Sequence, residues 1–357
     1  MMRRRTFLKT SAATAATAVA AASGPIILGA EDKAGSKNPV LGVEGHKYEV
    51  TTHDWGTLPG TLEWQTSHNV TIDSQGHVYV TQQGLKGRKV IDTIYVFDDK
   101  GKFVRSFGKE FHEGGHGVEV RKEGSDEFLY LSNTWTPKHK LMKTTLKGEV
   151  IWTKGRPECP EYADPKKPFN PTNICFTPDG GFIVGDGYGS NYLLKYDKDA
   201  KLVKVFGGTG TKLGQMRTPH GNWIDARDPK APVLVVCDRA NARLQTFDLD
   251  GKPLSATESG KVVLFPAHAK TRGDVLLVPD LHARVSLFGK GNEVIAHLGD
   301  DAEWRKKVLT QGIRSKPKEW PAGKFIHPHD AAFDTDGNII VVEWVSTGRV
   351  SFLKKVG

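Results

Sequence analysis

One segment recurs six times in this chain of 357 residues, and the repeat restricts the fold more than any other feature of the sequence. Each copy runs from an opening segment through an apolar stretch and a Gly/Asp turn into a second strand, and most then reach a third strand ending in Phe or Tyr. The copies start at positions 68, 116, 172, 220, 267 and 329, so their spacings are 48, 56, 48, 47 and 62 residues. The second and fifth copies are less regular, and the longer spacings carry inserted loops.

Each copy contains short runs that alternate between apolar and polar residues and are rich in β-branched and aromatic side chains, such as VYV, TIYVF, VLVV and NIIVV. Asp-Gly and Lys-Gly pairs between these runs are typical of tight turns. Four short strands in a unit of about 40–50 residues are typical of a propeller blade. We therefore predict an all-β chain that folds as a six-bladed β-propeller. A β-sandwich or two smaller β domains would explain the period poorly.

The last copy ends after its third strand, and the stretch KYEVTTHDW at 47–55 precedes the first copy. This stretch can supply the missing outer strand and close the ring. The predicted propeller therefore spans residues 46–357 as one domain, with its N-terminal strand completing the last blade.

The N-terminus has the pattern of an export signal. Three arginines at 3–5 precede an Ala-rich, weakly apolar run that ends in small residues at 28–30. This pattern resembles a twin-arginine signal peptide over residues 1–30, followed by a flexible leader over 31–45. A membrane anchor is disfavoured because the run is interrupted by Gly24-Pro25. We expect a periplasmic or secreted protein with no integral membrane segment once the signal is removed.

Charge and cysteine content limit the partners. The net charge is +9, and removing residues 1–30 removes four basic residues and no acidic one, which leaves +5. The remaining basic residues are mixed with acidic ones, so a nucleic-acid partner is not expected. Three cysteines without a CxxC pair do not indicate a disulfide framework. We expect a monomer that takes a small-molecule or peptide substrate in its central channel.

Three histidines open the second, fourth and sixth copies: His116, His220 and His329. Alternate blades of a six-membered ring lie about 120° apart, so these imidazoles should converge in the channel. Three imidazoles with an open fourth position form a typical catalytic zinc site. They could instead cap the blade mouths by hydrogen bonding to backbone. His68 shares the same register, and both interpretations stay open for it.

Two further residues follow the second strands of their blades. Tyr188 lies between two glycines, where packing gives little reason for a tyrosine, and a phenol beside a metal can act as a general base. Arg239 occupies the equivalent place in the next blade and could bind a carboxylate. A stacking tyrosine and a rim ion pair with Asp238 are the structural alternatives.

At these residues the chain resembles NHL-type six-bladed propellers, including the peptidyl-α-hydroxyglycine α-amidating lyases, over roughly 65–355. The segments GHGVEV, DGYGSN, MRTPHGNWID, VCDRANARLQTF and HPHDAAFD carry the resemblance. It implies zinc on the three strand-opening histidines, a catalytic base at Tyr188 and a pocket arginine at Arg239. It also implies a structural calcium ion held by Asp330 and the backbone carbonyls of Val70 and Val118.

Two positions depart from the family pattern. Gln83 stands where the family has an essential arginine, and His327 stands where it has a methionine. Both residues are predicted to contact substrate, as is His68 if it is not a metal ligand, and His327 could replace part of the missing donor. Loss of the arginine removes a group expected to hold the substrate carboxylate. We therefore expect this chain to share the scaffold of the family but not its amidating reaction.

Two functions remain open. The first is an exported, metal-dependent lyase, acting on a carbon–nitrogen or carbon–oxygen bond, or a hydrolase, with Tyr188 as base. The second is a non-catalytic NHL propeller that binds a peptide or glycan and uses the metal only structurally. Gln83 favours the second, whereas Tyr188 and Arg239 favour the first.

Overall fold

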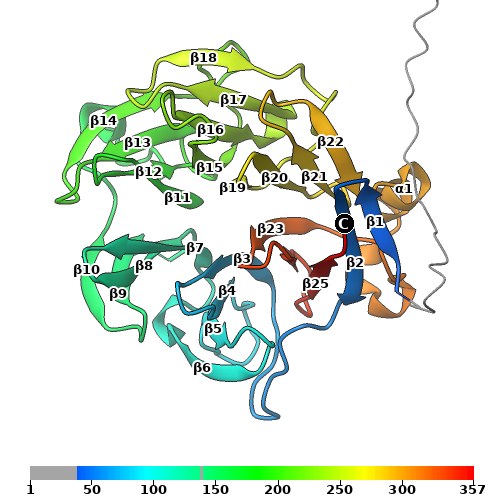
Figure 1. The fold of residues 1–357 in the computed structure, drawn as a ribbon. Coiled ribbons are helices and arrows are strands. Elements are labelled where there is room, and N and C mark those ends of the chain that lie inside the picture. Colours follow the sequence, from blue (N-terminus) through cyan, green and yellow to red (C-terminus); the bar gives the residue numbers. More distant parts are fainter. Residues whose placement is uncertain (1–37, 137–139) are drawn as a thin grey trace, which may run out of the picture.

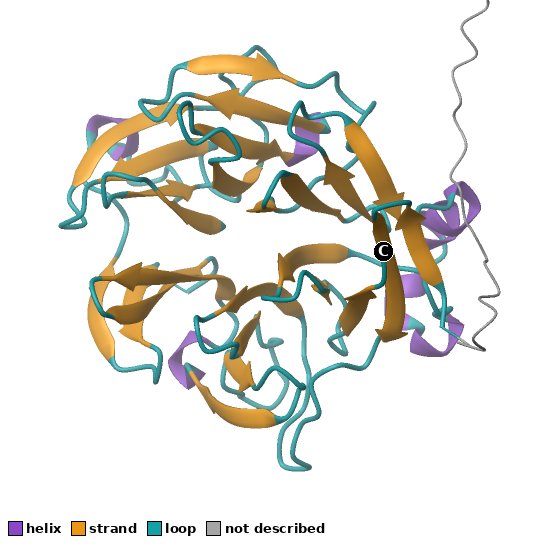
Figure 2. Cartoon of the chain, viewed as in Figure 1, coloured by secondary structure: helices purple, strands orange, loops and turns teal. Residues whose placement is uncertain are grey.

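A ring of six antiparallel sheets makes up this protein in the computed structural model, which describes residues 38–136 and 140–357 (Figure 1). The prediction of a six-bladed propeller is confirmed. The expected twin-arginine signal at 1–30, and the leader up to residue 37, lie outside the described residues. Strands dominate the described chain, and the few helical turns lie in loops between strands (Figure 2).

Each of the first five blades is a four-stranded meander. Blade 1 contains β3 (Ser67–Ile72), β4 (Val78–Gln82), β5 (Ile94–Phe97) and β6 (Phe103–Phe107). Blade 2 contains β7 (Gly115–Glu123), β8 (Asp126–Asn133), β9 (Leu141–Thr145) and β10 (Val150–Lys154). Blade 3 contains β11 (Asn173–Phe176), β12 (Phe182–Gly185), β13 (Tyr192–Tyr196) and β14 (Leu202–Gly207). Blade 4 contains β15 (Pro219–Asp225), β16 (Val233–Asp238), β17 (Arg243–Phe247) and β18 (Pro253–Ala256). Blade 5 contains β19 (Lys270–Arg272), β20 (Val275–Asp280), β21 (Arg284–Phe288) and β22 (Val294–Leu298).

The sixth blade joins the two ends of the described chain. It consists of β23 (Pro328–Phe333), β24 (Ile339–Glu343) and β25 (Val350–Lys355), and β2 (His46–Thr52) pairs with β25 as the outer strand. This pairing confirms the predicted closure and removes two free sheet edges. Figure 1 shows β2 beside the C-terminus.

A fifth strand in this blade was not expected. β1 (Val40–Val43) pairs antiparallel with β2, within the segment expected to be a flexible leader. Its Leu41 is buried in the same cluster as Leu298 and Phe325, so the apolar sequence VLGV gains burial by joining the sheet.

The hydrophobic core is divided among the blade interfaces. Val70 and Phe97 of blade 1, for example, pack against Ile340 and Val342 of blade 6. Similar clusters lie between each other pair of neighbouring blades. Because every sheet is packed on both faces, its inner strand is held firmly, and the side chains that open the inner strands have defined positions.

The longest spacing of the repeat, between blades 5 and 6, contains a helical insertion. It comprises α1 (Ala302–Thr310) and two short 3-10 turns, η4 (Ile313–Ser315) and η5 (Pro317–Glu319). Asp301 caps α1 by accepting a hydrogen bond from the Trp304 amide at 3.0 Å. Within the described ranges, no helix is long and apolar enough to cross a membrane.

Candidate metal centre

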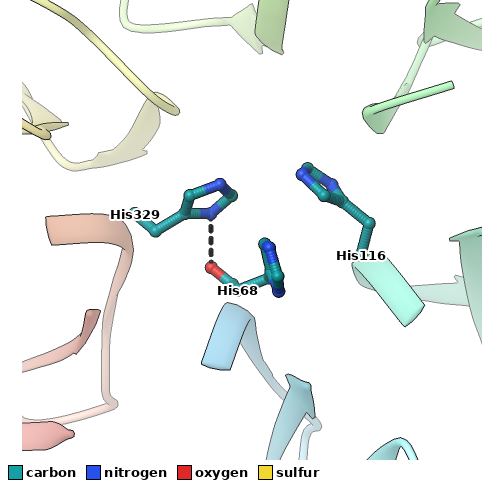
Figure 3. Close-up of side chains that lie close together, drawn as sticks. All are labelled: His68, His116 and His329. Carbon is teal, nitrogen blue, oxygen red and sulfur yellow. Dashed lines mark hydrogen bonds between the residues drawn. The ribbon is translucent and has the colours of Figure 1, made fainter. Parts of the chain in front are cut away.

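Four imidazoles meet where the inner strands of blades 1, 2, 4 and 6 begin. Figure 3 shows His68, His116 and His329 projecting from their strands toward a common point. The ring centroid of His220 lies 4.8 Å from that of His116 and 4.7 Å from that of His329. The ring centroid of His68 lies 4.7 Å from each of the same two centroids. The structure therefore brings the predicted trio together and adds His68 to it.

A shared hydrogen bond orients the three predicted ligands. The Nδ1 atoms of His116, His220 and His329 lie 2.7, 2.7 and 2.8 Å from backbone carbonyl oxygens. Each carbonyl belongs to the residue that opens the next blade: Thr172, Ala267 and His68 respectively. A carbonyl oxygen can only accept, so each Nδ1 carries the proton and each Nε2 presents its lone pair. Metal-binding histidines are commonly fixed in this way.

The Nε2 lone pairs of these histidines are not matched with hydrogen-bond donors, as buried lone pairs would be in a site that holds no metal ion. Nε2 of His116 lies 3.2 Å from Nε2 of His220, and Nε2 of His329 is buried without a hydrogen bond. Two lone pairs facing each other at this distance repel unless a cation lies between them. Zinc–nitrogen bonds of about 2.0–2.1 Å in a tetrahedral site place the nitrogens about 3.3 Å apart. The 3.2 Å distance between the Nε2 atoms of His116 and His220 therefore fits two ligands of one zinc ion.

His68 differs from the other three in its hydrogen bonding. The possible ligand atoms of His68, His116 and His329 lie within 4.8 Å of one another, so distance alone would include His68 in place of His220. However, Nδ1 of His68 is buried without a hydrogen bond, so His68 lacks the Nδ1–carbonyl bond that orients the other three rings, and its backbone carbonyl serves His329 instead. We give more weight to the oriented lone pairs, which favour His116, His220 and His329.

The protonation states also suit metal binding. Burial, with smaller contributions from neighbouring histidines and Arg239, lowers the pKa of His116, His220 and His329 well below the usual range. Burial likewise lowers the pKa of His68 to about 3. The imidazoles are therefore neutral at physiological pH, which is the form that binds a metal.

Tyr188 and Arg239 border this cluster as the sequence predicts. The Tyr188 ring lies 5.6 Å from His116 and 5.2 Å from His220, and it stacks on Trp135 at 5.3 Å. Arg239 Nη1 donates to the Tyr188 hydroxyl oxygen at 2.8 Å, whereas Arg239 Nη2 is buried without a partner. The guanidinium therefore fixes the phenol and keeps one donor for a ligand. No ion pair joins Arg239 to Asp238, whose carboxylate pairs with Arg243 at 2.8 Å.

Acidic residues at the ends of the second strands hold these loops in place. The Asp186 carboxylate accepts from the amides of Asn170 and Ser190, both at 2.6 Å, on either side of the Tyr188 turn. Asp238 accepts from the Arg217 amide at 2.7 Å, just before the strand of His220. Asp186, which precedes Gly187-Tyr188, and Asp238, which precedes Arg239, thus hold the loops in position by accepting hydrogen bonds from backbone amides.

Gln83 and His327, the two departures from the family pattern, are hydrogen-bonded to neighbouring blades. The Gln83 side chain is partly exposed and its Nε2 donates to the Glu113 carbonyl at 3.4 Å. His327 is partly buried, and its Nδ1 lies 2.7 Å from the Leu281 carbonyl. Both side chains are therefore engaged with neighbouring blades, and their contact with substrate stays a prediction.

The residues expected to hold calcium do not fit a calcium ion. The ammonium of Lys270, which is 6% exposed, lies 3.0 Å from Asp330 Oδ2 and also donates to the Val70 carbonyl. It lies 3.1 Å from Glu119 Oε1 as well. Burial alone would lower the pKa of Lys270, but Asp330 and Glu119 raise it, so the group is charged. An ammonium therefore already occupies the position expected for the cation.

The fold and the centre together define a class: six-bladed propellers with a cluster of strand-opening histidines. No family model matches the chain. It resembles NHL repeat-containing protein 3 of Mus musculus, with 27% identity over 256 residues that cover 64% of this chain and 71% of the mouse protein. It also resembles peptidyl-alpha-hydroxyglycine alpha-amidating lyase 1 of Drosophila melanogaster, with 25% identity over 275 residues, 70% of this chain and 46% of the fly protein.

Solved structures show the same fold at lower identity. A streptogramin B lyase superposes with a TM-score of 0.54 at 13% identity, over 82% of this chain and 95% of the lyase. A luciferin-regenerating enzyme gives a TM-score of 0.54 at 11% identity, over 83% and 93% of the two chains. This chain is therefore a propeller related at low identity to NHL repeat proteins and amidating lyases. It spans about half of the fly lyase.

Proposed function

We propose that this protein is an exported, zinc-dependent lyase or hydrolase whose metal is held by His116, His220 and His329. The observation that carries the proposal is the 3.2 Å approach of two Nε2 lone pairs, each on an imidazole whose Nδ1 is committed to a backbone carbonyl. Bound zinc would supply Lewis acidity toward a substrate oxygen. Calcium is not part of the proposal, since Lys270 takes that position.

Tyr188 is the group best placed to move a proton. Its oxygen accepts a hydrogen bond from Arg239, so its own O–H is free to point toward the histidines. A phenol beside the reacting atoms can exchange a proton with substrate. The remaining donor of Arg239, Nη2, is available for a substrate carboxylate. Together these residues support cleavage of a carbon–oxygen, carbon–nitrogen or ester-type bond in a small molecule or peptide.

We propose a periplasmic or secreted location, on the strength of the twin-arginine pattern at 1–30 alone. We do not extend the amidating reaction of the fly relatives to this chain, because Gln83 supplies no positive charge opposite blade 4. An anionic α-hydroxyglycine would therefore gain less stabilisation in the transition state.

Replacing Tyr188 with Phe is expected to lower kcat by about 10²–10⁴-fold on any substrate that the zinc-loaded enzyme cleaves, because general-base catalysis contributes about that much. The test is steady-state kinetics on a panel of esters, lactones and an α-hydroxyglycine compound. The matched control is Tyr192→Phe, which removes a hydroxyl that accepts a hydrogen bond from Lys167 outside the centre. Equal rates in wild type and Tyr188→Phe would remove Tyr188 as base. A zinc-loaded protein that turns over nothing in the panel would support the non-catalytic binding propeller.

A positive charge added at position 83 is expected to raise the rate on an anionic substrate. The Gln83→Arg variant is expected to raise kcat/KM on the α-hydroxyglycine compound by about tenfold or more, since a new charged contact is worth about 1.5–3 kcal/mol. Rates on neutral esters should not change. Strong turnover of α-hydroxyglycine by the wild type would show that position 83 does not decide this reaction.

A further inference from the structure

The loops that follow the second strands of blades 2 to 6 each carry a ring or a guanidinium within three residues of the strand end. In chain order these side chains are Trp135, Tyr188, Arg239, His282 and Trp344. The second strand of a blade runs antiparallel to the inner strand, so its end lies beside the start of that strand, as the pairing of Asn133 with Gly115 shows in blade 2. These loops therefore lie at the mouth of the channel where the histidines are.

Contacts between these side chains join four of the blades. The rings of Trp135 and Tyr188 stack with their centroids 5.3 Å apart and an angle of 26° between their planes. The Tyr188 hydroxyl oxygen accepts a hydrogen bond from Arg239 at 2.8 Å, and the guanidinium carbon of Arg239 lies 5.5 Å from the ring centroid of Phe265. Phe265 in turn stacks on His282, with centroids 5.0 Å apart. These flat groups form a continuous wall from blade 2 to blade 5.

Trp135 is the exposed end of this wall. It is 48% exposed although its ring stacks on Tyr188. The preceding residue fixes its position: the Thr134 amide donates to the Gly114 carbonyl and the Thr134 hydroxyl donates to the Pro171 carbonyl, both at 2.8 Å. An indole that is already held in place loses little conformational entropy when a ligand covers it, and it gains apolar burial.

One ring separates Trp135 from the proposed metal ligands. The Tyr188 ring, on which Trp135 stacks, lies 5.6 Å from the ring of His116 and 5.2 Å from that of His220. A ligand that contacts Trp135 can therefore place its other end at the histidines. The wall consists mainly of ring faces, and Arg239 Nη2 is a buried donor in it that lacks a partner. A sugar would leave many hydroxyl groups without partners on such a surface, whereas a flat unsaturated ring would not.

We propose that Trp135 is a specificity-determining residue that selects substrates bearing a planar aromatic ring. The substrate ring stacks on the exposed part of Trp135, and the bond to be cleaved lies beyond Tyr188 at the histidines. This inference rests on the proposed function, because it assumes that substrate reaches the histidines through this mouth. It narrows the substrate class to aryl compounds and to peptides with an aromatic side chain near the cleaved bond.

The test compares two neutral probes, benzamide and cyclohexanecarboxamide, in NMR titrations of the zinc-loaded protein. The saturated ring buries at least as much apolar area as the flat one, so a preference for benzamide isolates the contribution of stacking. The wild type is expected to bind benzamide about two- to tenfold more tightly, which is the usual effect of an aromatic pair beyond its buried area. Trp135→Leu should lose this preference and keep its metal content and its affinity for cyclohexanecarboxamide. Trp135→Phe, which keeps an aromatic ring, should retain most of the preference.

Leu213→Ala is the matched control, because Leu213 is an apolar side chain of similar exposure, 49%, in the loop between β14 and β15. It should bind both probes as the wild type does. The proposal is wrong if the wild type binds neither probe or binds both equally, or if a folded Trp135→Leu variant keeps the preference. A Trp135-dependent preference in a protein that holds no zinc would support this ligand preference and overturn the proposed function. A zinc-loaded protein without the preference would leave the proposed function standing and overturn this inference.

Discussion

Replacing Lys270 with methionine is expected to lower the free energy of unfolding by about 3–5 kcal/mol, the usual cost of removing one partner from a buried ion pair. The variant would keep Glu119 and Asp330 in the channel without the ammonium that lies 3.1 and 3.0 Å from them. Urea unfolding monitored by tryptophan fluorescence measures the change. Lys201→Met, at an exposed position, is the control and should lie within about 0.5 kcal/mol of wild type.

The same site predicts an unusual response to calcium. Thermal unfolding of the wild type should not respond to calcium or to the calcium-selective chelator EGTA, because Lys270 occupies the cation position. In Lys270→Ala, the freed oxygens of Asp330 and Val70 should accept the ion, and calcium at a hundred times its Kd would stabilise the variant by about 2.7 kcal/mol. A wild type that loses stability in EGTA would contradict the assignment of Lys270 as the internal cation.

Alanine at His116, His220 or His329 is expected to weaken zinc binding by more than about 100-fold, beyond the effect of losing an outer-shell partner. Each of these residues supplies an oriented Nε2, and two such ligands hold zinc weakly. His68→Ala is the informative comparison: because His68 lacks the Nδ1–carbonyl hydrogen bond that orients the other three rings, this variant should keep its zinc. Competition with a chromogenic zinc indicator measures all four affinities. Loss of zinc in His68→Ala together with its retention in His220→Ala would show that His68, and not His220, is the third zinc ligand.

The repeat predicts most of the features that position the candidate metal centre. The spacing of the copies gives six blades and their order, and the shared register of His116, His220 and His329 gives their convergence. The closing strand follows from a short last copy. Each of these features depends on positions that recur, so a single sequence contains enough information to predict them.

The residues that the sequence analysis missed fall into two groups. The missed residues Glu119 and Lys270 stand three positions after the openers of blades 2 and 5, and Asp330, named in the sequence analysis only as a calcium ligand, stands one position after His329. Applying the register argument to those positions would have placed an opposite-charge cluster in the channel. The helical insertion between blades 5 and 6 could not be predicted in this way, because it lies outside the repeat and its position depends on the packing of Trp304 and Ile313.

The central claim is that three imidazoles of this chain hold one zinc ion. Mass-spectrometric metal analysis of the purified mature protein, after exposure to zinc and extensive washing, tests it most directly. The account predicts one zinc ion per chain in the wild type and a loss of that zinc in His220→Ala. A folded wild-type protein that retains no more metal than His220→Ala would contradict it.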